Sequence, residues 1–433
     1  MPIPTSPDGN PPGLWAAAAP DGPECGALER HRDQGAECDV IVIGAGFTGL
    51  STALHLASRG VSVRVLESGS IGFGASGRNG GQVNPGWYIT PDRIRTLYGS
   101  AKAERVLDAA GGACDRVFAL IDQHEIACDA VRPGYIQAAP SAGGFKILND
   151  KIRQWSALGA PVEYLGHDEM TELIGTRNYE AGMLDRRGGN LNPLAYARGL
   201  AAAAITAGAH IHTRSAVTSV RRSNNRWSVS AANVQLNCDQ VVFATNAYTD
   251  NAWPGLRQAV IPVSSVIAAT EPLADNIRHS ILIHRHAVSE TARVFYYYKL
   301  DGHGRFLIGC KGPAFSAPDH HPATRARAAA LQLFPQLGNV AWEFSWGGYV
   351  AVTSDMRPRL MQLAPGVLTA MGYQGRGIAM ATEMGYELSQ HILDGDKRFP
   401  LTPLKRLPMH FAHRPAVFAK VLTARIMDRI KPS

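Results

Sequence analysis

The sequence predicts an α/β protein with some α+β elements, in which a parallel sheet is interleaved with a second, β-rich domain. The chain has 433 residues, of which 45% are hydrophobic and 18% are charged, so it can form a large core and two or three domains. Buried-strand patterns and glycine-rich turns occur together near residues 38–85, 190–250 and 365–394. Because β-rich stretches separate these segments, we expect one discontinuous domain completed by distant parts of the chain.

The domain limits follow from this alternation. The predicted limits of the first domain are residues 37–100, 175–255 and 345–400, and those of the second are residues 101–174 and 256–344. An irregular arm, residues 1–36, precedes them, and we expect Leu14 and Trp15 to pin it to the body. A basic helical tail, residues 401–433, follows.

Composition excludes several classes of protein. The six cysteines are scattered without a C-x-x-C pair, which argues against a disulfide framework and against a metal site. The N-terminus has no positive region followed by an apolar one, and no apolar run approaches about 18 residues. These features predict a cytoplasmic protein without a secretory signal or a membrane span.

The net charge of +7 is concentrated in the tail, where seven Lys or Arg residues face one Asp. Apolar residues recur there at helical spacing: Val417, Phe418, Val421, Leu422, Ile426 and Ile430. We expect a docked helix with a solvated basic face rather than a nucleic-acid or membrane surface, since no recognition motif accompanies the charge.

The first strong element is a glycine motif between two strands. Residues 38–43 (CDVIVI) are typical of a strand buried on both faces of a parallel sheet. GAGFTG follows at 44–49, then a helical apolar pattern that Gly60 closes, then a second strand at 61–67. This is the β-α-β context of a Rossmann-type dinucleotide-binding fingerprint.

Each glycine has a separate role in that fingerprint. Gly44 allows a tight turn, Gly46 lets the backbone approach a pyrophosphate, and Gly49 lets the helix pack on the strand. Glu67, 21 residues after Gly46, is placed to bind ribose hydroxyls and would repel a 2'-phosphate. The motif therefore predicts a dinucleotide other than NADP.

The later elements are less specific. We expect strands at 131–138, 239–245, 261–269 and 367–371, and a hairpin formed by 293–300 and 305–310. Asn192 is expected to cap a helix over 193–207 that ends at Gly208. The turn MGYQGRG at 371–377 opens a helix that runs to about residue 393.

A glycine-rich loop, SGSIGFGASGRNGGQ at 68–82, follows the second strand. Its five later glycines let the backbone lie close against a flat ligand, whereas a flexible surface loop is the alternative interpretation. The loop indicates which dinucleotide is bound better than the fingerprint does.

The sequence here closely resembles the flavin-dependent amine and D-amino-acid oxidase family, in which a G-x-G-A-S-x-R-N-G-G loop follows the ribose-binding acid. Four other segments agree: GGNLNPLAYARGLAAAA at 188–204, ATNAY at 244–248, LFPQL at 333–337, and TSDMRPRL followed by MGYQGRG. The resemblance spans roughly residues 37–400. It is strongest to the branch that contains gamma-glutamylputrescine oxidase, which shares the LWAA-type arm.

The resemblance implies FAD, held by a Rossmann-type domain of the glutathione-reductase and D-amino-acid-oxidase type beside a β-sheet-rich substrate domain. It also implies which residues contact FAD. They are Gly44, Gly46, Phe47, Thr48, Gly49, Glu67, Ser68, Gly74, Ala75, Ser76, Arg78, Asn79, Gly80, Gly81, Gln82, Val217, Thr245, Asn246, Gly372, Gly375, Arg376, Gly377 and Ile378. The second turn would direct a positive helix end to the flavin, which favours reduction; Arg376 either reinforces this or points to solvent.

Two departures from the family pattern narrow the expectation. Gly348 stands where sarcosine oxidases attach flavin through a cysteine, so FAD is expected to be noncovalent. Ala379 stands where they hold the substrate carboxylate with a lysine. Any carboxylate of the substrate is therefore expected to lie far from the oxidised carbon.

The implied reaction is hydride transfer from a primary or secondary amine to flavin N5. The imine then hydrolyses, and O2 is reduced to hydrogen peroxide. The partners expected are thus a small amine and O2, without nucleic acid or membrane. The first alternative is a dehydrogenase that passes electrons to a quinone or other carrier, with the basic tail as a docking surface. The second is a non-catalytic or NAD-sensing protein.

Candidate substrate-side residues come mainly from the hairpin. Alternation puts Tyr297 on one face and Tyr296 on the other, and one face is expected to line the cavity. Lys311, Trp346 and Tyr373 are further candidates that structural roles would also explain. Arg78 is the best charged candidate, with bracing of the loop backbone as its alternative.

Overall fold

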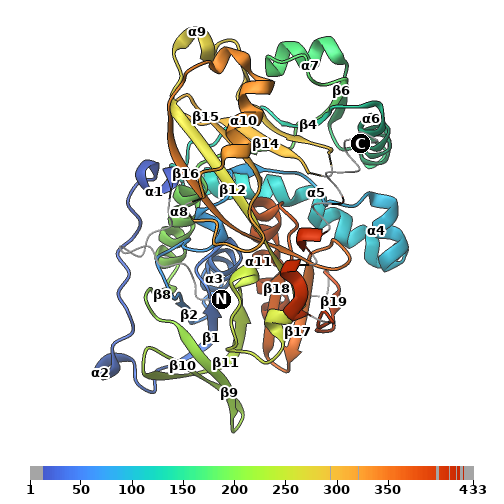
Figure 1. Ribbon diagram of the computed structural model, residues 1–433. Helices are drawn as coiled ribbons and strands as arrows, with labels where there is room; N and C mark the ends of the chain where they lie inside the picture. Colours follow the sequence, from blue (N-terminus) through green and yellow to red (C-terminus); the bar gives the residue numbers. More distant parts are fainter. Residues whose placement is uncertain are drawn as a thin grey trace.

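Two large sheets organise the chain (Figure 1). The computed structural model describes residues 13–292, 294–319, 321–395, 399–408, 410–415, 417–419 and 423. Within these residues the strands form a nine-stranded sheet, an eight-stranded sheet and a short two-stranded pair. The mixed α/β fold predicted from the sequence is confirmed.

The nine-stranded sheet has a parallel centre in the order β18-β11-β1-β2-β8. Its strands are β1 (Glu37–Ile43), β2 (Val63–Leu66), β8 (His210–His212), β9 (Val217–Ser223), β10 (Arg226–Ala231), β11 (Val234–Phe243), β17 (Arg359–Ala364), β18 (Val367–Met371) and β19 (Leu401–Thr402). β17 is antiparallel to β18, and β9 and β10 form an antiparallel meander with β11.

β1 explains why this sheet is buried on both faces. Val40 and Val42 pack into a core shared with the helices, whereas Ile41 and Ile43 pack into a core shared with β9 and β10. A continuous apolar run is what such a strand requires.

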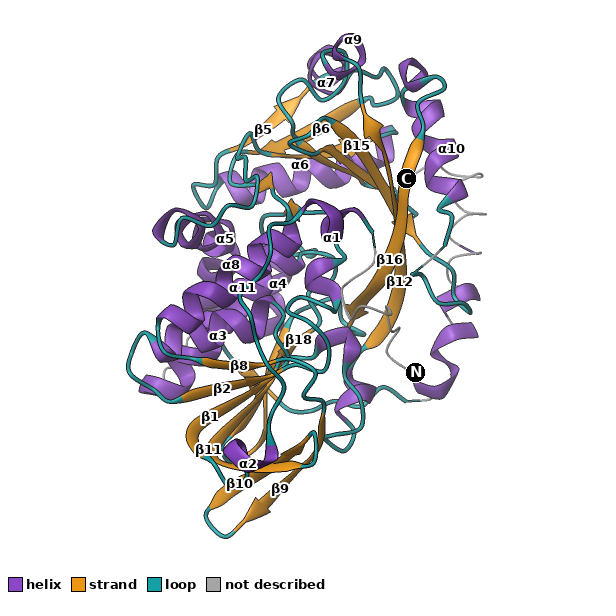
Figure 2. Cartoon of the chain, turned by 90° about the vertical axis from the view of Figure 1, so that its left-hand side faces the viewer, coloured by secondary structure: helices purple, strands orange, loops and turns teal. Residues whose placement is uncertain are grey.

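Helices cover one face of this sheet, as Figure 2 shows. They are α3 (Phe47–Ala57), α5 (Ser100–Gln123), α8 (Pro193–Thr206) and α11 (Gly377–Asp394), with α4 (Pro91–Tyr98) packed on α5. The predicted cap of α8 is confirmed, because the Asn192 side chain accepts a hydrogen bond from the Ala195 N–H. α3 and α11 pack closely: a Cβ on Gly385 would lie 2.5 Å from the Ser51 Cβ.

The eight-stranded sheet runs in the order β16-β12-β15-β14-β13-β4-β6-β5. Its strands are β4 (Tyr135–Ala139), β5 (Val162–Leu165), β6 (Ala181–Asp185), β12 (Ile261–Pro272), β13 (Ala287–Glu290), β14 (Tyr296–Leu300), β15 (Arg305–Lys311) and β16 (Trp342–Val352). One face packs against α7 (His167–Ile174) and α10 (Thr324–Leu333). The other face contacts α1 and α8 and so is turned toward the first sheet.

The remaining elements are short, apart from one helix beside β4. They are α1 (Leu14–Ala18), α2 (Arg30–Asp33), η1 (Ala75–Gly77), β3 (Gln82–Val83), α6 (Ala142–Ser156), β7 (Gly189–Asn190), η2 (Asn246–Tyr248), η3 (Leu256–Ala259), α9 (Asp275–Arg278), η4 (Pro335–Leu337) and η5 (His410–Ala412). β3 pairs with β7. None of the helices in the described part of the chain has the length and apolar character needed to cross a membrane.

The predicted hairpin is confirmed by β14 and β15, and α1 fixes the arm because Leu14 and Trp15 are buried. Two expected strands are shorter than predicted: β2 spans only Val63–Leu66, and β4 begins at Tyr135 instead of residue 131. Val131 forms only an isolated bridge with Asn190. Strand pairing, rather than apolar content, sets these limits.

The domain limits remain a prediction, but several elements differ from them, including β19, which was expected in the tail and belongs to the nine-stranded sheet. β6 and most of β16 were expected in the first domain, yet both belong to the eight-stranded sheet. α5 was expected in the second domain, yet it packs on α11. Most of the predicted tail helix lies outside the described residues. The six cysteines all lie within the described part of the chain, and none of them forms a disulfide.

Candidate functional site

Four parallel strands end side by side, and their following turns meet at one edge of the nine-stranded sheet. Gly44 follows β1, Glu67 follows β2, Thr245 follows β11 and Gly372 follows β18. Backbone and side-chain bonds tie the turns together: the Gly372 N–H donates to the Asn246 Oδ1 at 3.0 Å. In parallel sheets this carboxyl edge is where ligands bind.

The first glycine turn has no room for side chains. Gly44 has a φ of 108°, which favours glycine. A Cβ on Gly49 would lie 2.0 Å from the Gly44 carbonyl oxygen, and one on Gly46 would lie 2.8 Å from the Ser76 Oγ. The geometry agrees with the roles expected for the first and third glycines, and it brings Ser76 of the glycine-rich loop to the turn.

The start of α3 is linked to the glycine-rich loop and to the second glycine turn. The Phe47 N–H donates to the Ser76 Oγ at 3.0 Å, and the hydroxyls of Thr48 and Tyr373 lie 2.6 Å apart. Tyr373 donates in turn to the Ala370 carbonyl at 3.0 Å. Burial raises the pKa of Tyr373 above its ordinary value, so the hydroxyl stays protonated and Tyr373 serves as a link between turns.

Glu67 is a buried acceptor at the end of β2. Its carboxylate accepts hydrogen bonds from the Ala45 N–H at 2.7 Å, from the Gly69 N–H at 2.8 Å and from the Ser68 hydroxyl at 3.1 Å. Burial raises the pKa of Glu67, and these donors oppose that rise. The Ser215 N–H donates to the Glu67 carbonyl at 2.7 Å, two residues before Val217, with which β9 begins.

The glycine-rich loop is ordered, so the alternative of a flexible surface loop is wrong. The Asn79 amide donates to the carbonyls of Ala75 and Ser76. The Gln82 amide donates to the carbonyls of Val288 and Tyr298, both at 3.0 Å. The loop therefore joins the carboxyl edge to the eight-stranded sheet.

Two of the loop glycines lie close to aromatic rings. A Cβ on Gly74 would lie 3.3 Å from the Tyr248 ring, and one on Gly80 would lie 2.9 Å from the Tyr297 ring. The Gly81 N–H donates to the Asn79 Oδ1 at 2.8 Å.

Arg78 braces the loop. Its Nε donates to the Phe73 carbonyl at 2.7 Å, and its guanidinium pairs with Asp319. Trp346, which is fully buried, donates from its indole to the Arg78 carbonyl at 2.9 Å. The structure thus brings Arg78 and Trp346 together in a bracing arrangement, although the Arg78 Nη2 has no hydrogen-bond partner among the described residues.

The second glycine turn opens α11 and faces free space. A Cβ on Gly375 or Gly377 would meet nothing within 4 Å, and Ile378 is buried behind them. Arg376 is only 7% exposed and donates to the Pro85 carbonyl at 3.1 Å. Of the two alternatives for Arg376, the one in which it points to solvent is wrong, because the side chain is buried and bonded to Pro85.

The hairpin tyrosines lie on opposite faces. The Tyr297 hydroxyl is 2.8 Å from the Ser265 Oγ, on the face that meets Gly80. Tyr296 accepts a hydrogen bond from Arg325 of α10 on the other face, so the structure does not bring it to the loop. Lys311 ends β15 opposite Ser265.

Sequence reasoning missed two buried lysines on the Tyr297 side. Lys299 donates to the Leu191 carbonyl at 2.7 Å and lies 5.0 Å from the centre of the Trp15 ring. Lys151 of α6 donates to the Gln137 Oε1 at 3.0 Å. Burial lowers the pKa of each to about 7. The alternation of β14 could have revealed Lys299, whereas nothing marked Lys151 among the charged residues of its helix.

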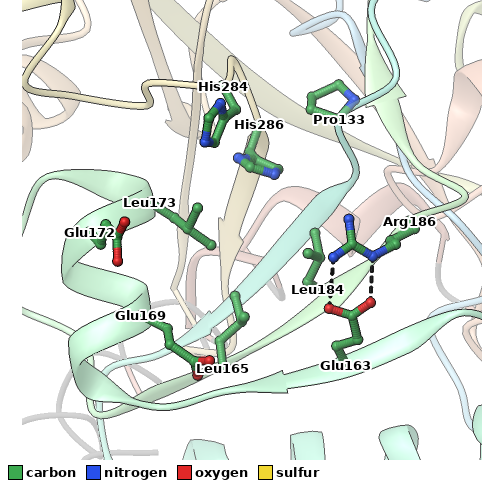
Figure 3. Close-up of a pocket in the computed structure, with 10 residues that line it drawn as sticks. All are labelled: Pro133, Glu163, Leu165, Glu169, Glu172, Leu173, Leu184, Arg186, His284 and His286. Atoms are coloured by element: carbon green, nitrogen blue, oxygen red, sulfur yellow. Dashed lines mark hydrogen bonds and ion pairs between the residues drawn. The ribbon is translucent and has the colours of Figure 1, made fainter.

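A separate cavity of about 650 Å³ lies beside α7, on the outer side of the eight-stranded sheet (Figure 3). The Glu163–Arg186 ion pair and the side chains of His284 and His286 line it. Burial lowers the pKa of His286 to about 4. None of the residues predicted for the site lines this cavity.

Known proteins resemble this chain over most of its length. Residues 39–391 match the family described as DAO, FAD dependent oxidoreductase. The probable oxidoreductase OrdL of Haemophilus influenzae is 31% identical over 385 residues, covering 87% of this chain and 88% of that protein. The gamma-glutamylputrescine oxidoreductase of Escherichia coli is 31% identical over 362 residues, covering 83% of this chain and 84% of that protein.

The fold is also similar to solved structures. Glycine oxidase from Geobacillus kaustophilus superposes with a TM-score of 0.70 at 22% identity, covering 85% of this chain and 99% of that one. At this level of identity the similarity concerns the architecture alone.

Proposed function

Since this chain belongs to the DAO family of FAD-dependent oxidoreductases, we propose that it oxidises a primary or secondary amine to an imine, with O2 as the electron acceptor. The imine then hydrolyses in water, and O2 leaves as hydrogen peroxide. The name of the Escherichia coli relative, which is 31% identical, supports an amine as the substrate.

The residues present fit FAD. Glu67 offers a buried carboxylate to ribose hydroxyls, the α3 N-terminus offers backbone N–H groups to a pyrophosphate, and open space lies before Gly375 and Gly377. Bound FAD would supply the two-electron acceptor that amine oxidation requires. Gly348 supports noncovalent binding, because a Cβ there would already lie 3.1 Å from the Tyr248 hydroxyl and 3.2 Å from the Arg78 Cβ.

The observation that carries the proposal is the position of loop 68–82 between the two sheets. Ser76 contacts the nucleotide turn, and Gly80 contacts Tyr297 on the opposite sheet. A flat ligand held along this loop would therefore have one end at the carboxyl edge and the other at the face of β14.

The side chains on that face suit orientation rather than proton transfer. Burial raises the pKa of Tyr297, so its hydroxyl is protonated and forms a hydrogen bond with the Ser265 hydroxyl. Tyr297 and Ser265 would hold a neutral amine and exclude water, because a bound and oriented substrate lowers the barrier without a side-chain base.

A panel of primary and secondary amines tests the proposal. The purified protein should be yellow, its flavin should be released by acid denaturation, and one class of amine should bleach the flavin without oxygen and release peroxide in air. Bleaching followed by slow reoxidation in air and fast reoxidation by a dye would replace the oxidase by a dehydrogenase. A colourless protein that binds no FAD would refute the proposal.

A further inference from the structure

Two buried cations lie against the same short segment of chain: Arg376 bonds to Pro85, and the Lys151 ammonium lies 5.9 Å from the centre of the Tyr88 ring. Lys151 on α6 is 8% exposed, and Arg376, which precedes α11, is 7% exposed. Both bond to neutral oxygens: Lys151 to the Gln137 side chain at 3.0 Å and Arg376 to the Pro85 carbonyl at 3.1 Å. Buried charges are normally paired with an opposite charge, so this arrangement is unusual.

No anion in the described part of the chain balances the pair. The charged group that acts on Lys151 is another cation, Arg376. The Tyr88 ring lies 5.9 Å from the Lys151 ammonium. The Arg376 Nε is buried without a hydrogen-bond partner among the described residues. A lysine ammonium has three donors, of which the structure assigns one. The pair therefore has donors left for an anionic group.

The register of the eight-stranded sheet places this pair relative to Tyr297. Gln137 of β4 pairs with Ser289 of β13, and Ser289 pairs with Tyr297 of β14. The three residues form one row across adjacent strands. With strands about 4.8 Å apart, Gln137 lies about 10 Å from Tyr297 along this row. Lys151 is thus at one end of a row whose other end meets the glycine-rich loop.

We propose that Lys151 and Arg376 bind a carboxylate at the far end of the amine substrate. The inference rests on the proposed function and narrows its substrate class to amines with a carboxylate several carbons from the oxidised carbon. Ala379 is fully buried in the helix core, so it offers nothing to a carboxylate attached directly to that carbon.

Binding of a simple carboxylate tests the site without turnover. Pentanoate should bind the full-length, FAD-loaded protein, as followed by calorimetry and by the flavin spectrum, whereas pentanamide should not. Lys151→Met should weaken pentanoate binding about 10- to 100-fold, since a charge-assisted bond is lost. The matched control is Lys146→Met, because Lys146 is an exposed lysine of the same helix and should leave the affinity unchanged.

Equal affinities in the two methionine variants would overturn the inference. Lys151→Met is expected to fold, since an apolar side chain replaces an unpaired buried cation, and its melting temperature checks this. Lys151→Gln serves as a second variant, which should show the same loss.

Kinetics separate this inference from the proposed function. For 5-aminopentanoate, Lys151→Met should raise KM at least about tenfold with little change in kcat, and pentylamine should be unaffected. Equal losses for both amines would overturn the carboxylate site. If no amine reduces the flavin, the proposed function fails, and pentanoate binding still decides the carboxylate site on its own.

Discussion

The two sides of the site differ in how they satisfy buried polar groups. On the nucleotide side, which comprises the two glycine turns and Glu67, backbone donors complete the carboxylate, and the Gly372 N–H completes Asn246. On the sheet side, which comprises the faces of β4 and β14 with α6, two lysines are buried without an ion pair among the described residues. The buried carboxylate of the nucleotide side thus has donors from the protein itself, whereas the two sheet-side lysines bond only to neutral oxygens.

The two lysines sharpen the contrast, because their surroundings differ. Burial lowers the pKa of both, but Asp129 and Asp301 act on Lys299 in the opposite direction, and the Trp15 ring covers it. Arg376 lowers the pKa of Lys151 further. Lys299 is therefore best explained as part of the protein's own packing, and Lys151 as part of a site that an anion completes.

The largest effect should come from the nucleotide side. Gly46→Val would place a branched side chain where a Cβ already lies 2.8 Å from the Ser76 Oγ and where a pyrophosphate would approach. We expect complete loss of flavin from a protein that still folds, measured as the ratio of flavin absorbance to protein. Gly26→Ala is the control, because a Cβ there meets nothing within 4 Å. Parental flavin content in Gly46→Val would contradict the role of the turn.

A smaller but still large effect should follow removal of Asp319, which balances Arg78 between the two sides. The Arg78 side chain is 1% exposed, so Asp319→Ala leaves a buried, unpaired cation and should lower the free energy of unfolding by about 3–5 kcal/mol. Asp92→Ala, in an exposed pair with Arg95, should change it by less than about 0.5 kcal/mol. Urea denaturation of the loaded protein measures both. Similar losses of unfolding free energy in the two variants would show that burial of Arg78 does not require its ion pair with Asp319.

The pH dependence of carboxylate binding tests the sheet side directly. Burial and Arg376 lower the pKa of Lys151 to about 7, and a carboxylate is attracted to the protonated form. Pentanoate affinity should therefore be nearly full at pH 6, about half of that at pH 7, and about tenfold lower at pH 8 than at pH 6. The Lys151→Met variant should lose this dependence. An identical pH profile in both proteins would assign the titration to another group.

The smallest effect concerns the arm that covers Lys299. Trp15→Phe keeps most of the edge contact with Trp346 but removes the indole bond to the Asn79 carbonyl at 2.7 Å. We expect a loss of about 1 kcal/mol in unfolding free energy, seen as a lower melting temperature. Trp253→Phe is a control, since the described residues give its indole ring contacts but no hydrogen bond. A greater loss in Trp253→Phe would remove this role from Trp15.

The contrast also explains what the sequence could predict. The nucleotide side depends on local patterns: apolar strands, glycines at fixed spacing and an acid at a strand end, so β1, α3 and the position of Glu67 were predictable. The Asn192 cap and the β14–β15 hairpin are equally local.

The glycine-rich loop and the sheet side depend on contacts between distant residues. Arg78 meets Asp319 across 241 positions, and Gln82 meets Tyr298 across 216. No local sequence pattern marks either contact. Lys151 looks like any helix lysine until the fold buries its ammonium against Gln137. Pairing of β3 with β7 was missed for the same reason, since two-residue strands have no periodicity.

The close packing of α3 on α11 has a consequence for the length of the cofactor. Ser51 and Thr52 donate to backbone carbonyls of α11, and the Thr48 hydroxyl meets that of Tyr373. The two helix starts are therefore held at a fixed distance from each other. FMN, which lacks the adenylate half, would place its flavin and single phosphate at these two starts but would offer no adenosine ribose to Glu67, and we expect the apoprotein to bind FAD more tightly.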